Sequence, residues 1–251
     1  MIREEVVFGP IFSRRLGSSL GINLLPENGK ICTFDCIYCE CGWNKDGRDD
    51  THLPSAERVR KALEAKLKEC LANQVPIDSI TFSGDGEPTL NPEFPQIIDD
   101  TIALRNKYFP HSKITVLSNA TMVHKPEVFN ALRKVDNPTM KIDAPTNALI
   151  EKINHPAPGY DIHRVVEALK QFNGDFILQT MFLKSKDFDS SNPEVLNGWM
   201  DIVRVLKPRE VMVYTIDRPT PEEGLRKFTV DEMKNLVQPL IDEGFVIQIK
   251  G

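Results

Sequence analysis

The stretch Cys32-Thr-Phe-Asp-Cys36-Ile-Tyr-Cys39 places three cysteines within eight residues, with three and then two residues between them. Thiolates are soft ligands that bind iron strongly, and iron–sulfur clusters are held by thiolates at short loop spacings of this kind. Three such ligands can hold three irons of a four-iron cluster, which leaves the fourth iron open to a small molecule. The sequence therefore predicts a cluster with one open iron, held by Cys32, Cys36 and Cys39.

The two remaining cysteines leave few other metal arrangements. A structural zinc site with Cys41 as fourth ligand is the alternative, but the single residue between Cys39 and Cys41 is too short for an ordinary zinc knuckle. Cys41 is expected to be a spectator, with roles as hydrogen-atom donor or substrate contact left open. Cys70 falls on the apolar stripe of a predicted helix, so it is expected to lie in the core. Only one cluster is therefore predicted.

Composition sets the broad class of the protein. The 251 residues suit one α/β barrel-type domain. We expect a cytoplasmic protein without a membrane segment, because no run approaches the roughly 18 apolar residues that span a bilayer and the first residues lack a signal-peptide core. In that compartment clustered cysteines indicate metal ligands or catalytic thiols. The net charge of −5 argues against RNA binding by the overall field, although a local basic patch stays open.

Short apolar runs alternate with segments of helical period along the chain. Strands are expected at 20–25, 78–82, 113–117, 138–143, 175–182, 210–216 and 245–249. Helices are expected at 55–73, 94–108, from about 126, and at 146–153, 161–172, 193–206 and 229–243. This order predicts a parallel sheet with right-handed crossovers, either open or curled into a partial barrel. We expect one domain over 1–251, with an N-terminal arm at 1–19 and a cluster loop at 26–54.

Polar segments follow most of the predicted strands. Ligand sites of parallel α/β sheets lie at the carboxyl ends of the strands. Besides the cysteine loop, the segments of this kind are 84–87, 118–119, 141–143, 179–180 and 214–218. We expect them to converge on one mouth, which the loop 184–193 and the N-terminal arm would cover to exclude water.

The cysteine loop, with Tyr38 before its last cysteine, resembles the cluster loop of the radical S-adenosylmethionine (SAM) superfamily. The segments Gly9-Pro-x-x-Ser-Arg14-Arg15-Leu-Gly-x-Ser-Leu-Gly21 and Ser83-Gly-x-Gly-Glu-Pro-Thr-Leu90 resemble those of the wyosine-synthase-related Fe–S oxidoreductases in particular. The resemblance covers nearly the whole chain. It implies an α/β fold, a partial (β/α)6 TIM-like barrel of the radical SAM type, and a [4Fe–4S] cluster as cofactor together with SAM.

The resemblance also implies an activity. In that family the reduced cluster cleaves SAM, and the resulting 5′-deoxyadenosyl radical abstracts a hydrogen atom from the substrate. An electron donor such as flavodoxin or ferredoxin is then needed. The implied substrate class is a nucleobase, including one in transfer RNA, which the acidic chain argues against. An activase of a glycyl-radical enzyme is one alternative, and a non-catalytic Fe–S or zinc-binding module is another. No catalytic residue beyond the cluster ligands is assigned.

The resemblance implies that the glycine-rich turn offers backbone oxygens to the ammonium group of SAM, with Glu87 fixing the site. Lys141 suits the carboxylate of SAM, and Asp143 suits its ribose hydroxyls. The turn would otherwise be a proline-led helix start, and the other residues would cap strand ends. The expected cofactor-binding residues are Tyr38, Gly84, Asp85, Gly86, Glu87, Pro88, Ser118, Asn119, Lys141, Asp143 and Gln179.

Three arginines and one tyrosine have open assignments. Arg14 and Arg15 form a candidate anion clamp, since a guanidinium group recognises phosphate or carboxylate in bidentate fashion. Arg218 beside the expected mouth has the same ambiguity between a clamp and a solvated surface charge. Tyr214 is expected either near adenine or in the core with its hydroxyl satisfied.

Overall fold

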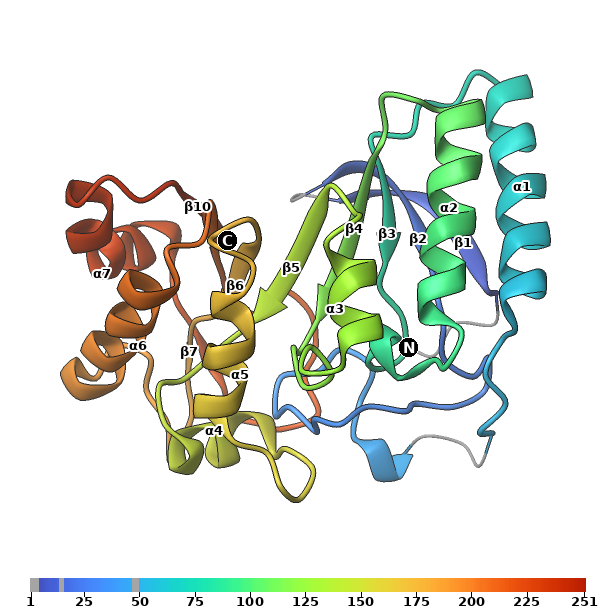
Figure 1. The fold of residues 1–251 in the computed structure, drawn as a ribbon. Coiled ribbons are helices and arrows are strands. Elements are labelled where there is room, and N and C mark those ends of the chain that lie inside the picture. The colour runs from blue at the N-terminus through green and yellow to red at the C-terminus, as the bar shows by residue number, and fades with distance from the viewer. Residues whose placement is uncertain (1–4, 14–15, 47–49) are drawn as a thin grey trace. The chain divides into compact units, whose positions relative to one another are not determined.

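The computed structural model describes residues 5–13, 16–46 and 50–251, in which strands and helices alternate (Figure 1). Two compact units can be distinguished. The first comprises Met1–Cys32, Asn44–Ser118 and His124–Pro138, and the second comprises Thr33–Trp43, Asn119–Val123 and Thr139–Gly251. The predicted candidate anion clamp, Arg14 and Arg15, lies outside the described residues. The single domain expected over 1–251 stays a prediction.

The first unit contains four strands in the order β1-β2-β3-β4. Strand β1 (Val7–Ser13) pairs antiparallel with β2 (Gly17–Ile22), and β2, β3 (Ser79–Phe82) and β4 (Lys113–Ser118) run parallel. Strand β1 was not predicted, because its stretch was assigned to the N-terminal arm at 1–19. One glycine shows why the hairpin forms, since a Cβ on Gly21 would lie 2.1 Å from the Phe8 ring. Gly21 thus makes room for a cross-strand aromatic ring.

The helices of the first unit are α1 (Ala56–Ala72), α2 (Phe94–Tyr108) and α3 (Pro126–Leu132), with short 3-10 turns η1 (Asn44–Asp46) and η2 (Pro88–Leu90). Helices α1 and α2 lie side by side (Figure 1). Ser55 caps α1 by accepting a hydrogen bond from the Arg58 N–H. The apolar stripe of α1 is buried and includes Cys70, which is 2% exposed, so its predicted core position is confirmed.

The second unit contains parallel strands in the order β5-β6-β8-β10, with β5 included from Thr139 onward. These strands are β5 (Asn137–Lys141), β6 (Ile177–Met181), β8 (Glu210–Tyr214) and β10 (Ile247–Lys250). A small antiparallel ladder joins β7 (Leu183–Lys184) to β9 (Arg226–Lys227), two strands too short for a periodicity to reveal. The predicted loop 184–193 folds back on this ladder, with Phe188 buried, and its role as a cover stays a prediction.

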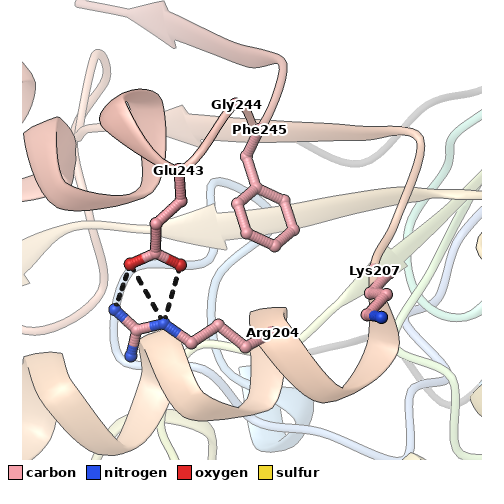
Figure 2. Close-up of a pocket in the computed structure, with 5 residues that line it drawn as sticks. All are labelled: Arg204, Lys207, Glu243, Gly244 and Phe245. Atoms are coloured by element: carbon pink, nitrogen blue, oxygen red, sulfur yellow. Dashed lines mark hydrogen bonds and ion pairs between the residues drawn. The ribbon is translucent and has the colours of Figure 1, made fainter.

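The helices of the second unit are α4 (Asn147–Asn154), α5 (Ile162–Lys170), α6 (Pro193–Leu206) and α7 (Val230–Asp242). Arg204 on α6 pairs with Glu243 after α7, beside a surface hollow that Phe245 and Lys207 also line (Figure 2). Among the described residues, none of the helices is long and apolar enough to cross a bilayer. The cytoplasmic location stays a prediction.

One buried hydrogen-bond chain fixes the strand ends of the second unit. Trp199 on α6 is 2% exposed, and its indole N–H donates to the Thr180 hydroxyl on β6 at 3.0 Å. The Thr180 hydroxyl in turn donates to the Ile142 carbonyl at 2.8 Å. Because Ile142 lies between Lys141 and Asp143, this chain holds the end of β5, where two predicted site residues lie.

Thr180→Val is expected to lower the free energy of unfolding by about 1–3 kcal/mol, because it leaves the buried Trp199 N–H without an acceptor and the Ile142 carbonyl without that donor. Chemical denaturation measures the loss. In a Trp199→Phe background the same substitution should cost less, because the donor has already been removed. Equal costs in the two backgrounds would contradict the assigned hydrogen bond.

Candidate functional site

In the first unit, the glycine-rich turn holds the residue that precedes the first cysteine. Ile31 N–H donates to the Asp85 carbonyl at 3.1 Å, and Glu87 N–H donates to the Ile31 carbonyl at 3.0 Å. These bonds form a parallel bridge between Ile31 and Gly86. Cys32 therefore begins its loop from a backbone fixed to the turn predicted to bind SAM.

The two glycines of this turn are required by contacts within the protein. A Cβ on Gly86, whose φ is +143°, would lie 1.8 Å from the Ile31 carbonyl oxygen. A Cβ on Gly84 would lie 2.0 Å from Oδ1 of Asn23. The sequence suggested that these glycines admit a ligand to the backbone, whereas close approach to Asn23 and Ile31 already accounts for both. Their role in cofactor binding stays a prediction.

Asn23 is a site residue that the sequence analysis did not identify. It is 1% exposed, and its Oδ1 accepts hydrogen bonds from the Leu25 N–H at 3.1 Å and the Asp85 N–H at 3.2 Å. Its Nδ2 is buried without a partner among the described residues. The available signal was one amide side chain inside the otherwise apolar run 20–25.

Glu87 and Ser118, both predicted site residues, are brought together. Glu87 is 2% exposed and caps η2, where its Oε1 accepts a hydrogen bond from the Thr89 N–H at 3.1 Å. The same oxygen accepts the hydroxyl hydrogens of Thr89 and, at 2.9 Å, of Ser118. The turn is thus also the proline-led helix start that the sequence offered as the alternative, with Pro88 in the first turn.

In the second unit, Cys36 lies among hydrogen-bond donors. It is 5% exposed, and its Sγ lies 3.0 Å from Nζ of Lys141 and 3.3 Å from Nδ2 of Asn154. Lys141 Nζ also donates to the Tyr38 hydroxyl at 2.8 Å. Three predicted site residues, Cys36, Tyr38 and Lys141, are therefore in direct contact.

Asp143 contacts the same group of residues, and its side chain is fully buried. Its Oδ2 accepts hydrogen bonds from the Tyr38 hydroxyl and, at 2.7 Å, from Asn154 Nδ2, and lies 3.6 Å from Lys141 Nζ. Its Oδ1 accepts the Met181 N–H at 2.9 Å. Both oxygens are engaged within the protein, so Asp143 has a structural role, and its binding to ribose stays a prediction. Asn154 was not identified from the sequence. The available signal was an asparagine at the end of a predicted helix, since asparagine is disfavoured in helices.

Electrostatics set the protonation of this group. Burial raises the pKa of the Cys36 thiol, although Lys141 opposes the shift. Burial lowers the pKa of Lys141, but its interactions with the neighbouring acidic groups of Cys36 and Asp143 outweigh burial and raise that pKa well above its usual value. Burial and the Asp143 charge also raise the pKa of Tyr38 well above its usual value. Lys141 is therefore a cation and Tyr38 a neutral donor at neutral pH.

Asn119 and Gln179 lie in two further polar contacts of the second unit. Asn119 donates from Nδ2 to the hydroxyl of Thr33 at 2.8 Å, and Thr33 directly follows Cys32 in the chain. Gln179 donates from Nε2 to the Tyr214 hydroxyl at 2.9 Å, while its Oε1 is buried without a partner among the described residues. The Tyr214 hydroxyl thus has a partner, the residue is half-buried, and its place near adenine stays a prediction.

The remaining cysteines and Arg218 are more accessible. Cys32, Cys39 and Cys41 are half-buried, and none of the five cysteines, all of which lie among the described residues, is in a disulfide. Cys39 N–H donates to the Cys36 carbonyl at 3.0 Å, which turns the chain between these two cysteines. Among residues 5–13, 16–46 and 50–251, no three His, Cys, Asp or Glu side chains form a ready-made metal site. Arg218 is exposed and pairs with the Glu40 carboxylate at 2.8 Å, so it behaves as a surface charge.

The donor set nonetheless fits an iron–sulfur cluster. Cysteine thiolates at these spacings are the ligands that such clusters use, and the thiols are not consumed by disulfides. Hydrogen-bond donors to a ligand sulfur, as Lys141 and Asn154 are to Cys36, are the contacts by which proteins orient and tune such ligands.

Comparison with known proteins places the chain in a family. The model of the radical SAM superfamily matches residues 29–189. A UPF0026 protein of Synechocystis sp. is 30% identical over 223 residues, which cover 86% of this chain and 77% of that protein. A UPF0026 protein of Helicobacter pylori is 28% identical over 248 residues, which cover 97% and 76%. A protein of Brachyspira hyodysenteriae named GTPase Obg is 31% identical over 237 residues, covering 93% of this chain but only 33% of that protein.

Solved structures agree on the fold. A radical SAM methyltransferase from Sphaerobacter thermophilus matches 95% of this chain and 67% of its own, with a TM-score of 0.71 and 15% identity. SuiB of Streptococcus suis bound to SAM matches 92% of this chain and 50% of its own, with a TM-score of 0.65 and 17% identity. The chain thus spans half to two thirds of these solved proteins.

The chain belongs to the radical SAM superfamily and, within it, to the UPF0026 proteins. The predicted fold class, an α/β partial barrel of the radical SAM type, is confirmed, as is its assignment as an enzyme. Members of this superfamily use a [4Fe–4S] cluster and SAM and need a reductant, as predicted. The resemblance to wyosine-related enzymes stays a prediction.

Gly86→Ala is expected to lower the free energy of unfolding by about 1–3 kcal/mol more than Gly159→Ala does. Both glycines have positive φ, but a Cβ at Gly86 meets the Ile31 carbonyl while one at Gly159 meets nothing within 4 Å. Chemical denaturation of the two variants and the parent protein measures the difference. Equal losses would contradict the close approach of Ile31 to the turn.

Proposed function

We propose that this chain binds one [4Fe–4S] cluster through Cys32, Cys36 and Cys39 and cleaves SAM reductively. When bound, the reduced cluster supplies one electron to SAM, and the resulting 5′-deoxyadenosyl radical abstracts a hydrogen atom from the substrate. The observation that carries the proposal is the Cys36 thiol. It belongs to the three-cysteine motif inside the matched region, and two side chains donate hydrogen bonds to its sulfur.

The chain's own residues would orient the ligand sulfurs. Lys141 and Asn154 hold Cys36 Sγ between two donors, which restricts its rotamer before the cluster binds. The bridge between Ile31 and Gly86 fixes the backbone that leads into Cys32. Asn119, through Thr33, restrains the residue on the other side of Cys32. Such supporting contacts matter because ligands held loosely bind metal less tightly.

Two unpartnered buried atoms support polar ligand binding near the predicted SAM residues. Nδ2 of Asn23 is a free donor beside the turn that contains Asp85, and Oε1 of Gln179 is a free acceptor at the end of β6. A buried polar atom without a partner costs about 1–3 kcal/mol. The amino, carboxylate, ribose and adenine groups of SAM offer partners of both kinds. Within the proposal, SAM is bound by Tyr38, Gly84, Asp85, Gly86, Glu87, Pro88, Ser118, Asn119, Asp143 and Gln179, whereas Lys141, also expected among them, donates to the Cys36 sulfur.

The substrate within this proposal is a nucleobase, including one in transfer RNA, on the strength of the resemblance to wyosine-related enzymes. The electron donor is a flavodoxin or ferredoxin, since the cluster must be reduced by one electron at a time. Membership in an enzyme superfamily speaks against the non-catalytic Fe–S or zinc-binding module. No contact of the described residues favours the glycyl-radical activase over the nucleobase enzyme.

Purified and reconstituted without oxygen, the protein is expected to hold about four irons and little zinc per chain. On reduction with SAM present it should release 5′-deoxyadenosine. Cys36→Ala should lose both the iron and the product, because it removes one ligand. Metal analysis and chromatography of the reaction mixture measure these outcomes.

Cys41→Ala is the matched control, since Cys41 lies in the same loop and is half-buried like Cys32 and Cys39. It should keep the iron and the release of 5′-deoxyadenosine. Loss of iron in Cys41→Ala would mean that the ligand set is wrong. A colourless parent protein loaded with zinc would overturn the proposed function itself.

A further inference from the structure

Lys141 is a buried cation whose ammonium group contacts Cys36, Tyr38 and Asp143. Its side chain is 14% exposed. Nζ lies 3.0 Å from Cys36 Sγ, 2.8 Å from the Tyr38 hydroxyl and 3.6 Å from Asp143 Oδ2. The contacts to Cys36 and Tyr38 are hydrogen bonds, and the Asp143 carboxylate is an ion-pair partner.

Aromatic rings complete the setting of this cation. Nζ of Lys141 lies 5.3 Å from the centroid of the Phe34 ring and 4.9 Å from that of the Tyr38 ring. Ring faces attract cations at such distances, and more strongly where water is excluded. The positive charge is therefore held close to the Cys36 sulfur by groups on several sides.

A positive charge and hydrogen bonds at a ligand sulfur change the reduction potential of an iron–sulfur cluster. Reduction adds one negative charge to the cluster, so a nearby cation stabilises the reduced form more than the oxidised form. Hydrogen bonds to sulfur act in the same direction, because they withdraw charge from the thiolate. A nearby carboxylate acts in the opposite direction. The sign of each residue's effect therefore follows from its charge and from whether it donates a hydrogen bond to the sulfur.

We propose that Lys141 and Asn154 are positioning residues that raise the reduction potential of the cluster through their hydrogen bonds to the Cys36 sulfur, against the opposing charge of Asp143. This inference rests on the proposed function, in which Cys36 is a cluster ligand. It assigns Lys141 to the cluster rather than to the SAM carboxylate. Its consequence is that a milder one-electron donor can reduce the cluster than would suffice without this cation.

The test is a redox titration of the reconstituted full chain without SAM, followed by the electron paramagnetic resonance (EPR) signal of the reduced cluster. Lys141→Met should shift the midpoint potential to more negative values, because it removes both the cation and a donor. Lys141→Arg, which keeps a cationic donor, should shift it less. Asp143→Asn should shift it the other way, to less negative values. Iron content of each variant, measured in parallel, confirms equal loading.

Removing Lys141 alone leaves the buried Asp143 carboxylate without its cation, and that can prevent folding. The double variant Lys141→Met/Asp143→Asn removes both charges and keeps the group neutral. Compared with Asp143→Asn alone, it is expected to have a more negative potential. Opposite shifts from neighbouring substitutions cannot arise from a general loosening of the fold.

The outcomes separate the inference from the proposed function. If the parent protein binds a cluster but Lys141→Met leaves its potential unchanged, the tuning role is overturned while the cluster enzyme stands. An unchanged potential with weaker SAM binding would assign Lys141 to the SAM carboxylate instead, and also overturn the inference. A parent protein that takes up no cluster would overturn both.

Discussion

The second unit depends on satisfying one buried carboxylate. Asp143 has a fully buried side chain, and a charge in that position is costly unless it is paired and hydrogen-bonded. It is met by a hydroxyl from the cysteine loop, an amide at the end of α4, a backbone N–H of β6 and a lysine of β5. Each of these groups comes from a different part of the chain. Meeting the charge of Asp143 therefore brings the cysteine loop to the strand ends.

The two donors at the Cys36 sulfur follow from the same arrangement. Lys141 and Asn154 each contact both Asp143 and Cys36, so the carboxylate that orders them also aims them at the sulfur. The first unit solves a similar problem with backbone alone, where Gly86 lets Ile31 approach closely enough to form a bridge. In each unit the cysteine-bearing segment is anchored by residues distant in sequence.

Much of the fold could be predicted because its signals are local. The helices at 94–108 and 193–206 end at the predicted residues, since apolar spacing and proline at the helix start mark them clearly. The hairpin of β1 and β2 was not predicted, because its glycines are typical of turns. Gly21 is needed there because its missing Cβ leaves room for the ring of Phe8, which lies thirteen residues away in sequence. Asn23 and Asn154 were not predicted either, because their hydrogen-bond partners, Asp85 and Cys36, are brought near only by folding. The family pattern also did not reveal that Lys141 contacts a cysteine sulfur.

We propose above all that three cysteines hold a cluster whose fourth iron binds SAM. The most direct test is the EPR spectrum of the reduced, reconstituted protein recorded with and without SAM. We predict a reduced four-iron cluster signal whose line shape changes when SAM is added, because SAM becomes a ligand of the open iron. A cluster signal that SAM leaves unchanged, or the absence of any such signal in protein that contains zinc, would contradict the claim.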